Sequence, residues 1–213
     1  MQTVIWDWNG TLLDDIDFCV STINSLLEKR NLARLNRELY KEVFTFPVQD
    51  YYEAIGFDFE KEQFAIPANE FMEIYTSGVN RCKLHPSSIE ILSYFKTCGV
   101  RQFVLSAMKQ ELLEETLKHQ SIFNFFEGVF GIDNNFGISK IERGKQLISE
   151  LKLNVNETWI IGDTIHDFEV AEELGIKCIL VADGHQSEER LLNTGVTVIR
   201  KLDDVKKNSL ICQ

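Results

Sequence analysis

The spacing of apolar residues changes along the chain, and each pattern predicts a different kind of element. The run Thr3–Trp6 is short, apolar and rich in β-branched residues, which predicts a buried strand. Between residues 15 and 82 the spacing becomes helical, with apolar side chains at steps of three or four residues. They stand at Ile16, Val20, Ile23 and Leu27. This spacing predicts an amphipathic helix, and two further helices are expected over Asn36–Phe44 and Ala68–Tyr75.

From Leu84 onward, helical patterns alternate with short apolar strands. Helices are expected over residues 86–98, 109–119, 141–151, 167–174 and 188–193, and strands over 101–105, 158–161, 177–181 and 196–199. Strands that are separated by helices cannot pair as hairpins, so they pair in parallel through crossover connections. The pattern therefore predicts an α/β fold, a doubly wound (Rossmann-like) parallel sheet with a small α-helical insertion after its first strand. We expect a core of residues 1–14 and 83–213, and a helical domain of residues 15–82.

Composition and charge narrow the possible partners. The chain has 213 residues, enough to bury a core, and a net charge of −11. So acidic a chain has no general attraction for nucleic acid or for an anionic membrane, and an anionic substrate needs a local cation. Five widely spaced cysteines predict reduced thiols. Because no signal-like segment and no long apolar run is present, we expect a cytoplasmic protein.

Three predicted strands end in a polar residue. Asp7 follows the first strand, Ser106 follows Phe103–Leu105, and Asp163 follows Trp159–Gly162. In an open parallel sheet, ligands bind beyond the carboxyl ends of the strands. The three side chains are therefore expected to converge on one crevice, although Asp and Ser also commonly begin turns after strands.

These residues belong to four motifs in a characteristic order. The motifs are DWNGT at Asp7–Thr11, Ser106, Lys140 before a predicted helix, and GDTIHD at Gly162–Asp167. In this order they resemble the haloacid dehalogenase (HAD) superfamily of phosphohydrolases. Lys145 is a second candidate for the motif lysine, but it lies inside the helix and fits the family pattern less well.

The resemblance extends over nearly the whole chain. The helical insertion is similar to the cap domain of the subclass that includes phosphoglycolate phosphatases. The segments Asp133–Lys140 and Gly184–Leu191 also resemble this subclass, more weakly. The implied activity is hydrolysis of a small phosphorylated metabolite.

The resemblance implies Mg²⁺ as the cofactor. A divalent cation removes the repulsion between a carboxylate nucleophile and a phosphate dianion, and Mg²⁺ prefers oxygen ligands. Asp7 and Asp163 would supply carboxylate oxygens, and Asn9 its backbone carbonyl. Asp167 would bind the metal through water or orient Lys140.

The resemblance also assigns the catalytic and phosphate-binding residues. Asp7 would attack phosphorus and form an aspartyl-phosphate, which water then cleaves. Ser106 and Lys140 would hold the phosphoryl oxygens. Trp8 and Asn9 are also expected among the phosphate-binding residues.

One residue departs from the family pattern. Asn9 stands where phosphatases of this family have a second Asp, the general acid and base. An amide supplies neither function, and general acid–base catalysis is worth about 10²–10⁴-fold in rate. The enzyme is then either slow, or selective for good leaving groups such as acyl or aryl phosphates, or assisted by His166 or His185. The alternative is a catalytically weakened phosphate-binding or regulatory protein.

The insertion carries two further groups of candidate residues. An aromatic cluster should form mostly the core of the cap, with one or two members lining the substrate pocket; it comprises Phe44, Phe46, Tyr51, Tyr52, Phe57 and Phe59. Four cations could contact a second anionic group on the substrate, although a solvated position is the simpler interpretation; they are Arg34, Arg37, Lys41 and Arg81.

Overall fold

A computed structural model describes residues 2–132, 140–206 and 211, and it places six parallel strands in one sheet of order β5-β4-β1-β6-β7-β8. The strands are β1 (Thr3–Trp6), β4 (Arg101–Lys109), β5 (Gly128–Ile132), β6 (Thr158–Gly162), β7 (Lys177–Val181) and β8 (Thr197–Ile199). The helices of this part are α5 (Ser88–Thr97), α6 (Gln110–His119), α7 (Lys140–Glu150), α8 (Ile165–Leu174) and α9 (Glu188–Leu192). The predicted α/β fold with a doubly wound parallel sheet is confirmed.

The sheet is covered on both faces, and the alternation of side chains along β1 shows how. Val4 and Trp6 pack in a core with residues of α5 and α6. Ile5 points to the opposite face and packs with residues of α7 and α8. All three side chains are completely buried. A parallel strand buried on both faces reads as a continuous apolar run, which is why residues 3–6 were recognisable as a strand.

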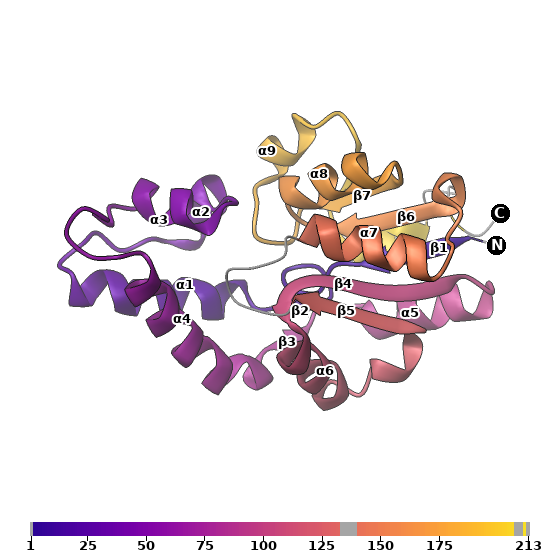
Figure 1. Ribbon diagram of the computed structural model, residues 1–213, viewed down its shortest axis with the longest axis horizontal. Helices are drawn as coiled ribbons and strands as arrows, with labels where there is room; N and C mark the ends of the chain where they lie inside the picture. Colours follow the sequence, from indigo (N-terminus) through magenta and orange to yellow (C-terminus); the bar gives the residue numbers. More distant parts are fainter. Residues whose placement is uncertain (1, 133–139, 207–210, 212–213) are drawn as a thin grey trace.

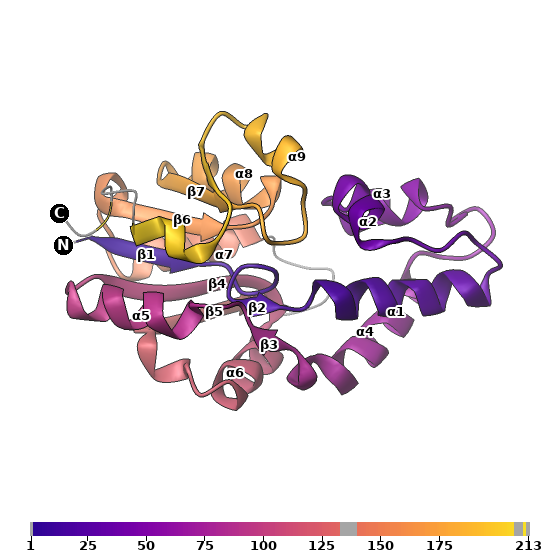
Figure 2. The same cartoon turned by 180° about the vertical axis from the view of Figure 1, so that it is seen from behind.

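The helical insertion extends from one end of the sheet (Figures 1 and 2). It contains α1 (Ile16–Lys29), α2 (Arg37–Val43), α3 (Val48–Ala54) and α4 (Ala65–Gly78). Two short strands, β2 (Leu13–Asp14) and β3 (Lys83–Leu84), pair antiparallel where the chain enters and leaves it. We call α1–α4 and their connections the cap. The exact division at residues 14/15 and 82/83 stays a prediction.

The loop after β7 holds the cap against the sheet domain. The side chains of Gln186 and Arg190 donate hydrogen bonds to the backbone oxygen of Phe44, at 2.9 and 2.7 Å. In the other direction, the Lys41 ammonium donates to the backbone oxygen of Ala182 at 2.9 Å. These bonds join the end of α2 to the segment 182–190, so the cap lies over the carboxyl edge of the sheet.

The structure differs from the predicted elements in several places, among them the short strands β2 and β3, which the sequence did not indicate. The apolar pattern did not indicate β5, a partly exposed edge strand that contains two glycines, or α3. Strand β4 continues past Leu105 to Lys109, so Ser106 lies within a strand and not after it. The register between β4 and β5 shifts between Leu105 and Lys109, which locally bends this end of the strand.

Two smaller expectations concern the thiols and membranes. The four cysteines among the described residues are free thiols, and Cys212 lies outside them. The segment Asp133–Ser139 also lies outside the described residues. Within the described ranges, no helix combines the length and apolar character that crossing a membrane requires.

Candidate active site

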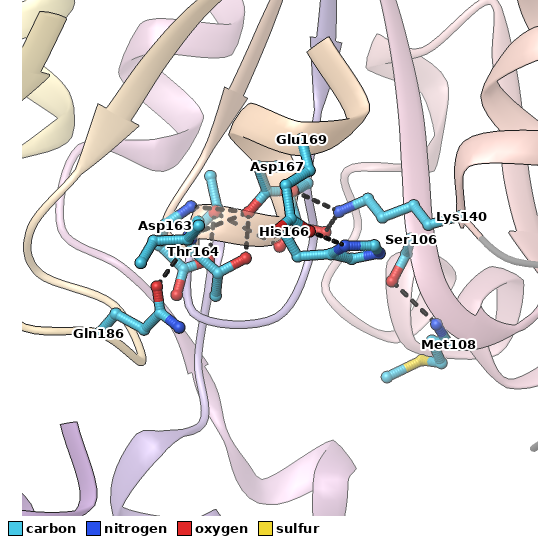
Figure 3. Close-up of polar contacts among 12 residues, drawn as sticks. Ser106, Met108, Lys140, Asp163, Thr164, His166, Asp167, Glu169 and Gln186 are labelled. Carbon is cyan, nitrogen blue, oxygen red and sulfur yellow. Dashed lines mark hydrogen bonds and ion pairs between the residues drawn. The ribbon is translucent and has the colours of Figure 1, made fainter. Parts of the chain in front are cut away.

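Asp7 and Asp163 directly follow β1 and β6, as the sequence predicts, and Ser106 lies inside the adjacent strand β4, toward its carboxyl end. Strand β1 lies between β4 and β6, so Asp7 has a central position. The backbone nitrogen of Asp7 donates to the oxygen of Ile161 at 2.9 Å, which continues the β1–β6 pairing to the site. The Ser106 hydroxyl accepts a hydrogen bond from the Met108 nitrogen at 3.1 Å (Figure 3). All three predicted side chains are buried.

Lys140, the first residue of α7, points into this group of side chains (Figure 3). Its ammonium contacts Asp7 Oδ1 and lies 2.5 Å from Asp167 Oδ1. Burial lowers the pKa of Lys140, but the two carboxylates outweigh that effect and raise it overall, so the side chain is an ammonium. Lys145, in contrast, is half exposed and pairs with Glu142 at 3.0 Å. The geometry therefore favours Lys140 over Lys145 as the lysine of the site.

Asp167 joins the helix start to Lys140. Its Oδ2 atom accepts hydrogen bonds from the Thr164 nitrogen (3.0 Å), the Thr164 hydroxyl (2.8 Å) and the Asp163 nitrogen (3.2 Å). These bonds satisfy donors at the first turn of α8. Burial raises the pKa of Asp167, but Lys140 and the hydrogen bonds lower it overall, so the group is a carboxylate. With Oδ2 used in this way, Oδ1 positions the Lys140 ammonium beside Asp7.

Asp163 is held by two donors and enclosed by glycine. Its Oδ1 accepts from the Thr11 hydroxyl at 2.8 Å, and its Oδ2 from the His185 nitrogen at 2.6 Å. Gly10 has a φ of +72°, and a Cβ there would lie 2.3 Å from Asp163 Oδ2. The close approach and the left-handed backbone together require glycine at this position of the DWNGT motif.

The site combines three buried carboxylates with one ammonium. One oxygen from each of Asp7, Asp163 and Asp167 lies within 4.8 Å of the others. Burial raises the pKa of both Asp7 and Asp163; for Asp7, Lys140 opposes that rise and the neighbouring carboxylates add to it. A divalent cation would balance the negative charge that Lys140 leaves uncompensated. Because the donors are hard oxygens, the residues fit Mg²⁺.

Asn9 belongs to a second buried network that the sequence motifs do not indicate. Its amide nitrogen donates to Asp15 Oδ2 (2.8 Å) and to the Tyr75 hydroxyl (2.6 Å). The other Asp15 oxygen pairs with His185 Nε2 at 3.1 Å, and His185 Nδ1 contacts the Tyr40 hydroxyl at 2.9 Å. The side chain at position 9 therefore acts as a hydrogen-bond donor toward a carboxylate.

The Asp15–His185 pair is charged at neutral pH. Burial would raise the pKa of Asp15, but the His185 charge and the hydrogen bonds lower it to about 2. Burial would lower the pKa of His185, but Asp15 outweighs this and raises it to about 9. Sequence reasoning missed Asp15 and Tyr75; the local signal was a pair of acidic residues, Asp14 and Asp15, shortly after the first motif.

A cavity of about 250 Å³ lies above Asp7, between the sheet domain and the cap. Asp7, Ser106 and Lys140 border it together with residues 107–109 of β4 and with Thr164 and His166, and many of the other lining residues are aromatic side chains of the cap. Four members of the predicted aromatic cluster line the cavity, more than the one or two expected; they are Phe44, Phe46, Tyr51 and Tyr52. The Trp8 side chain is completely buried and is not among the lining residues, so the expected phosphate contact of Trp8 could not come from its side chain.

A parallel α/β sheet with carboxylates gathered at its carboxyl edge is compatible with a hydrolytic enzyme, and comparison with known proteins agrees. Residues 4–181 match the family model described as "Haloacid dehalogenase-like hydrolase". The chain therefore belongs to the haloacid dehalogenase-like hydrolase family. The resemblance indicated by the four motifs, and with it the expectation of a hydrolytic enzyme, is confirmed.

The individual proteins that resemble this chain have low sequence identity to it. A phosphoglycolate phosphatase of Caulobacter vibrioides is 25% identical in an alignment that covers 96% of this chain and 89% of the relative. A protein named tyrosine-protein kinase PtkA, from Mycobacterium tuberculosis, is 25% identical over 93% of this chain and 68% of its own. A haloacid dehalogenase-like hydrolase from Streptococcus pneumoniae has the same fold, with a TM-score of 0.85 at 18% identity over 98% of both chains.

Proposed function

We propose that this protein is a Mg²⁺-dependent phosphatase that hydrolyses a small phosphorylated compound through an aspartyl-phosphate on Asp7. The observation that carries the proposal is the position of Asp7. Its buried carboxylate contacts the Lys140 ammonium at the end of the cavity that Ser106 also borders. The phosphatase names of the Caulobacter relative and of several proteins with this fold support the same assignment.

The residues divide the chemistry among them. A Mg²⁺ ion held by Asp7, Asp163 and the backbone carbonyl of Asn9 would offset the repulsion between carboxylate and phosphate. An Asp7 oxygen attacks phosphorus as the bond to the leaving oxygen breaks, and water later cleaves the acyl phosphate. The Lys140 ammonium and the Ser106 hydroxyl hold phosphoryl oxygens. Asp167 keeps Lys140 in place through its 2.5 Å contact.

The leaving group receives no proton from Asn9. Its amide is bound to Asp15 and Tyr75 and carries no acidic proton. Of the two histidines that could substitute, His185 has both ring nitrogens engaged, by Asp15 and Tyr40. His166 borders the cavity and binds Glu169 through Nδ1, so it is the better candidate.

The second candidate function is phosphate binding without turnover, and Asn9 is the observation that favours it. A protein of this kind would bind phosphorylated ligands on the same residues but form no covalent intermediate. Its Asp7 would have no catalytic use, which is the reason to prefer the enzyme.

One experiment separates the two functions. Mg²⁺-dependent hydrolysis is measured on p-nitrophenyl phosphate, acetyl phosphate and a panel of sugar and nucleotide monophosphates, with intact-mass analysis for a phosphorylated Asp7. We expect turnover that is lost by at least ~10³-fold in Asp7→Asn, with the fold intact. Phosphate binding without any turnover of the panel would instead establish the binding protein.

A further inference from the structure

The cavity wall opposite Asp7 is aromatic and apolar. It is formed by α2, α3, α4 and the connections between them, and includes Phe44, Phe46, Phe64 and Phe71. The rings support one another: Phe44 and Phe46 meet edge to face with centroids 5.5 Å apart, and Phe71 stacks on Tyr75 at 5.8 Å. Offset and edge-to-face contacts of this kind make a rigid surface on which another ring can pack.

Charged groups are absent from this wall among the described residues. Most of the charged side chains that border the cavity belong to two pairs near Asp7. Lys140 pairs with Asp7, and His185 pairs with Asp15. Lys109 of β4 also borders the cavity, and it is exposed.

The cap cations that the sequence suggested as substrate contacts lie elsewhere. Arg34 pairs with Glu28, Arg37 with Asp17, and Lys41 with the Ala182 oxygen; Arg81 is exposed and does not line the cavity. A second anionic group on the substrate would therefore face aromatic rings, and the cation beside them, the His185 imidazolium next to Phe44, is already paired with Asp15.

Hydroxyl-rich ligands also find few partners there. The Tyr40 hydroxyl is bound to His185 and the Tyr75 hydroxyl to Asp15. Among the lining residues that the structure describes, Tyr51 has a buried hydroxyl with no partner. Because this hydroxyl is itself buried, it is not a ready partner for the several hydroxyls of a sugar.

The size of the cavity matches one aromatic ring beyond the phosphate. Cavities of ~150 Å³ lined by apolar side chains bind benzene, and this cavity has about 250 Å³.

The identity of residue 9 independently favours an aryl leaving group. A phenolate, with a conjugate-acid pKa of about 10, needs a proton far less than an alkoxide does, and Asn9 donates none.

We propose that the substrate is an aryl phosphomonoester whose ring packs against the aromatic wall of the cap. This inference rests on the proposed phosphatase function and names its substrate class. In the first step the Asp7–phosphorus bond forms, the bond from phosphorus to the aryl oxygen breaks, and the phenolate leaves and takes a proton from water. In the second step a water oxygen bonds to phosphorus and the bond from phosphorus to the Asp7 oxygen breaks. This restores the Asp7 carboxylate and releases inorganic phosphate, and the protons of the attacking water pass to the phosphate and to solvent.

The test compares substrates that share the reacting group. Phenyl phosphate, 4-carboxyphenyl phosphate, acetyl phosphate and phosphoglycolate are assayed with the wild-type enzyme at saturating Mg²⁺. Burial of an apolar ring favours binding, so we expect the KM of phenyl phosphate to be at least ~10-fold below that of acetyl phosphate. The para carboxylate should raise KM at least ~10-fold relative to phenyl phosphate and change kcat little.

Two variants locate the effect in the wall. Phe71→Ala should lower the ratio of kcat/KM for phenyl phosphate to that for acetyl phosphate by at least ~5-fold. Leu39→Ala, on the exposed side of α2 and outside the cavity lining, is the matched control and should leave the ratio unchanged.

The outcomes distinguish this inference from the function on which it rests. Equal KM values for phenyl and acetyl phosphate, or preferred hydrolysis of phosphoglycolate, would overturn the aryl assignment and leave the phosphatase intact. Failure to hydrolyse any of the four compounds would overturn the proposed function and this inference with it.

Discussion

The amide nitrogen of Asn9 lies 2.8 Å from the Oδ2 atom of Asp15, inside the network that also contains Tyr75 and His185. An Asp at position 9 would face a second carboxylate at this distance. The absence of the family's general acid is thus matched by a negative charge six residues further along the chain. A substitution at position 9 is therefore expected to depend on the side chain at position 15.

The first prediction exchanges these two side chains. Asn9→Asp alone should lower the melting temperature, because two buried carboxylates repel each other. The double variant Asn9→Asp with Asp15→Asn keeps the charge of the network. It should recover stability and raise alkyl-ester hydrolysis by at least ~10-fold, since a carboxyl group then stands at the position of the general acid.

Rates on an alkyl phosphate and on p-nitrophenyl phosphate, together with melting curves, check this prediction, and Asp15→Asn alone serves as the control. An unchanged alkyl-ester rate in a stable exchange variant would show that the proton comes from elsewhere. His166 would be the next residue to replace.

The second prediction concerns the two lysines of α7. Lys140→Met should reduce kcat/KM by about 10²–10³-fold, because it removes a charged group beside the phosphoryl oxygens. Lys145→Met should stay within about twofold of the wild type, since that side chain pairs with Glu142 at the surface. Steady-state kinetics at a temperature where both variants are folded measures the two values of kcat/KM. Equal losses in the two variants would contradict the assignment of Lys140 as the lysine of the site.

The third prediction uses thermal stability as a readout of metal binding. Mg²⁺ at about 100 times its Kd stabilises the folded state by about 2.7 kcal/mol, which corresponds to a rise of roughly 5–10 °C in Tm for a chain of this size. Asp163→Asn should abolish the increment. Asp183→Asn, a half-exposed carboxylate outside the three-carboxylate cluster, should retain it. A Tm that does not respond to Mg²⁺ in the wild type would argue against the metal site.

The fourth prediction is a pH dependence of stability that His185 causes. Its pKa in the folded protein is about 9, above the ordinary value of 6.5. The stabilisation from the Asp15–His185 pair is therefore complete below pH 6.5 and is lost as the pH rises through 9. The shift corresponds to a contribution of up to about 3 kcal/mol.

Urea unfolding of the wild type and of His185→Gln between pH 6 and 10 measures this contribution. The difference in unfolding free energy between the two proteins should shrink as the pH rises. A constant difference would mean that His185 is not charged in the folded protein.

Local sequence patterns determined the parallel sheet and the residues at its edge. Val4–Trp6 reads as a strand because both of its faces are buried, and Asp7 and Asp163 follow such strands directly. The carboxyl ends of parallel strands meet at one edge, so this part of the site was predictable from the order of the elements. Strand β5 was not, because an edge strand with two glycines and partly exposed side chains has no distinct hydrophobic pattern.

Only the tertiary structure decided what surrounds Asn9 and what forms the far side of the cavity. Tyr75 is 66 residues from Asn9 in the chain, and His185 is 170 residues from Asp15, yet hydrogen bonds join each pair. No local pattern reports contacts over such separations, because they depend on how the cap lies on the sheet. The same holds for the aromatic wall: spacing predicts that these rings are buried, but whether they face the cap interior or the substrate is set by the packing of α2–α4 over Asp7.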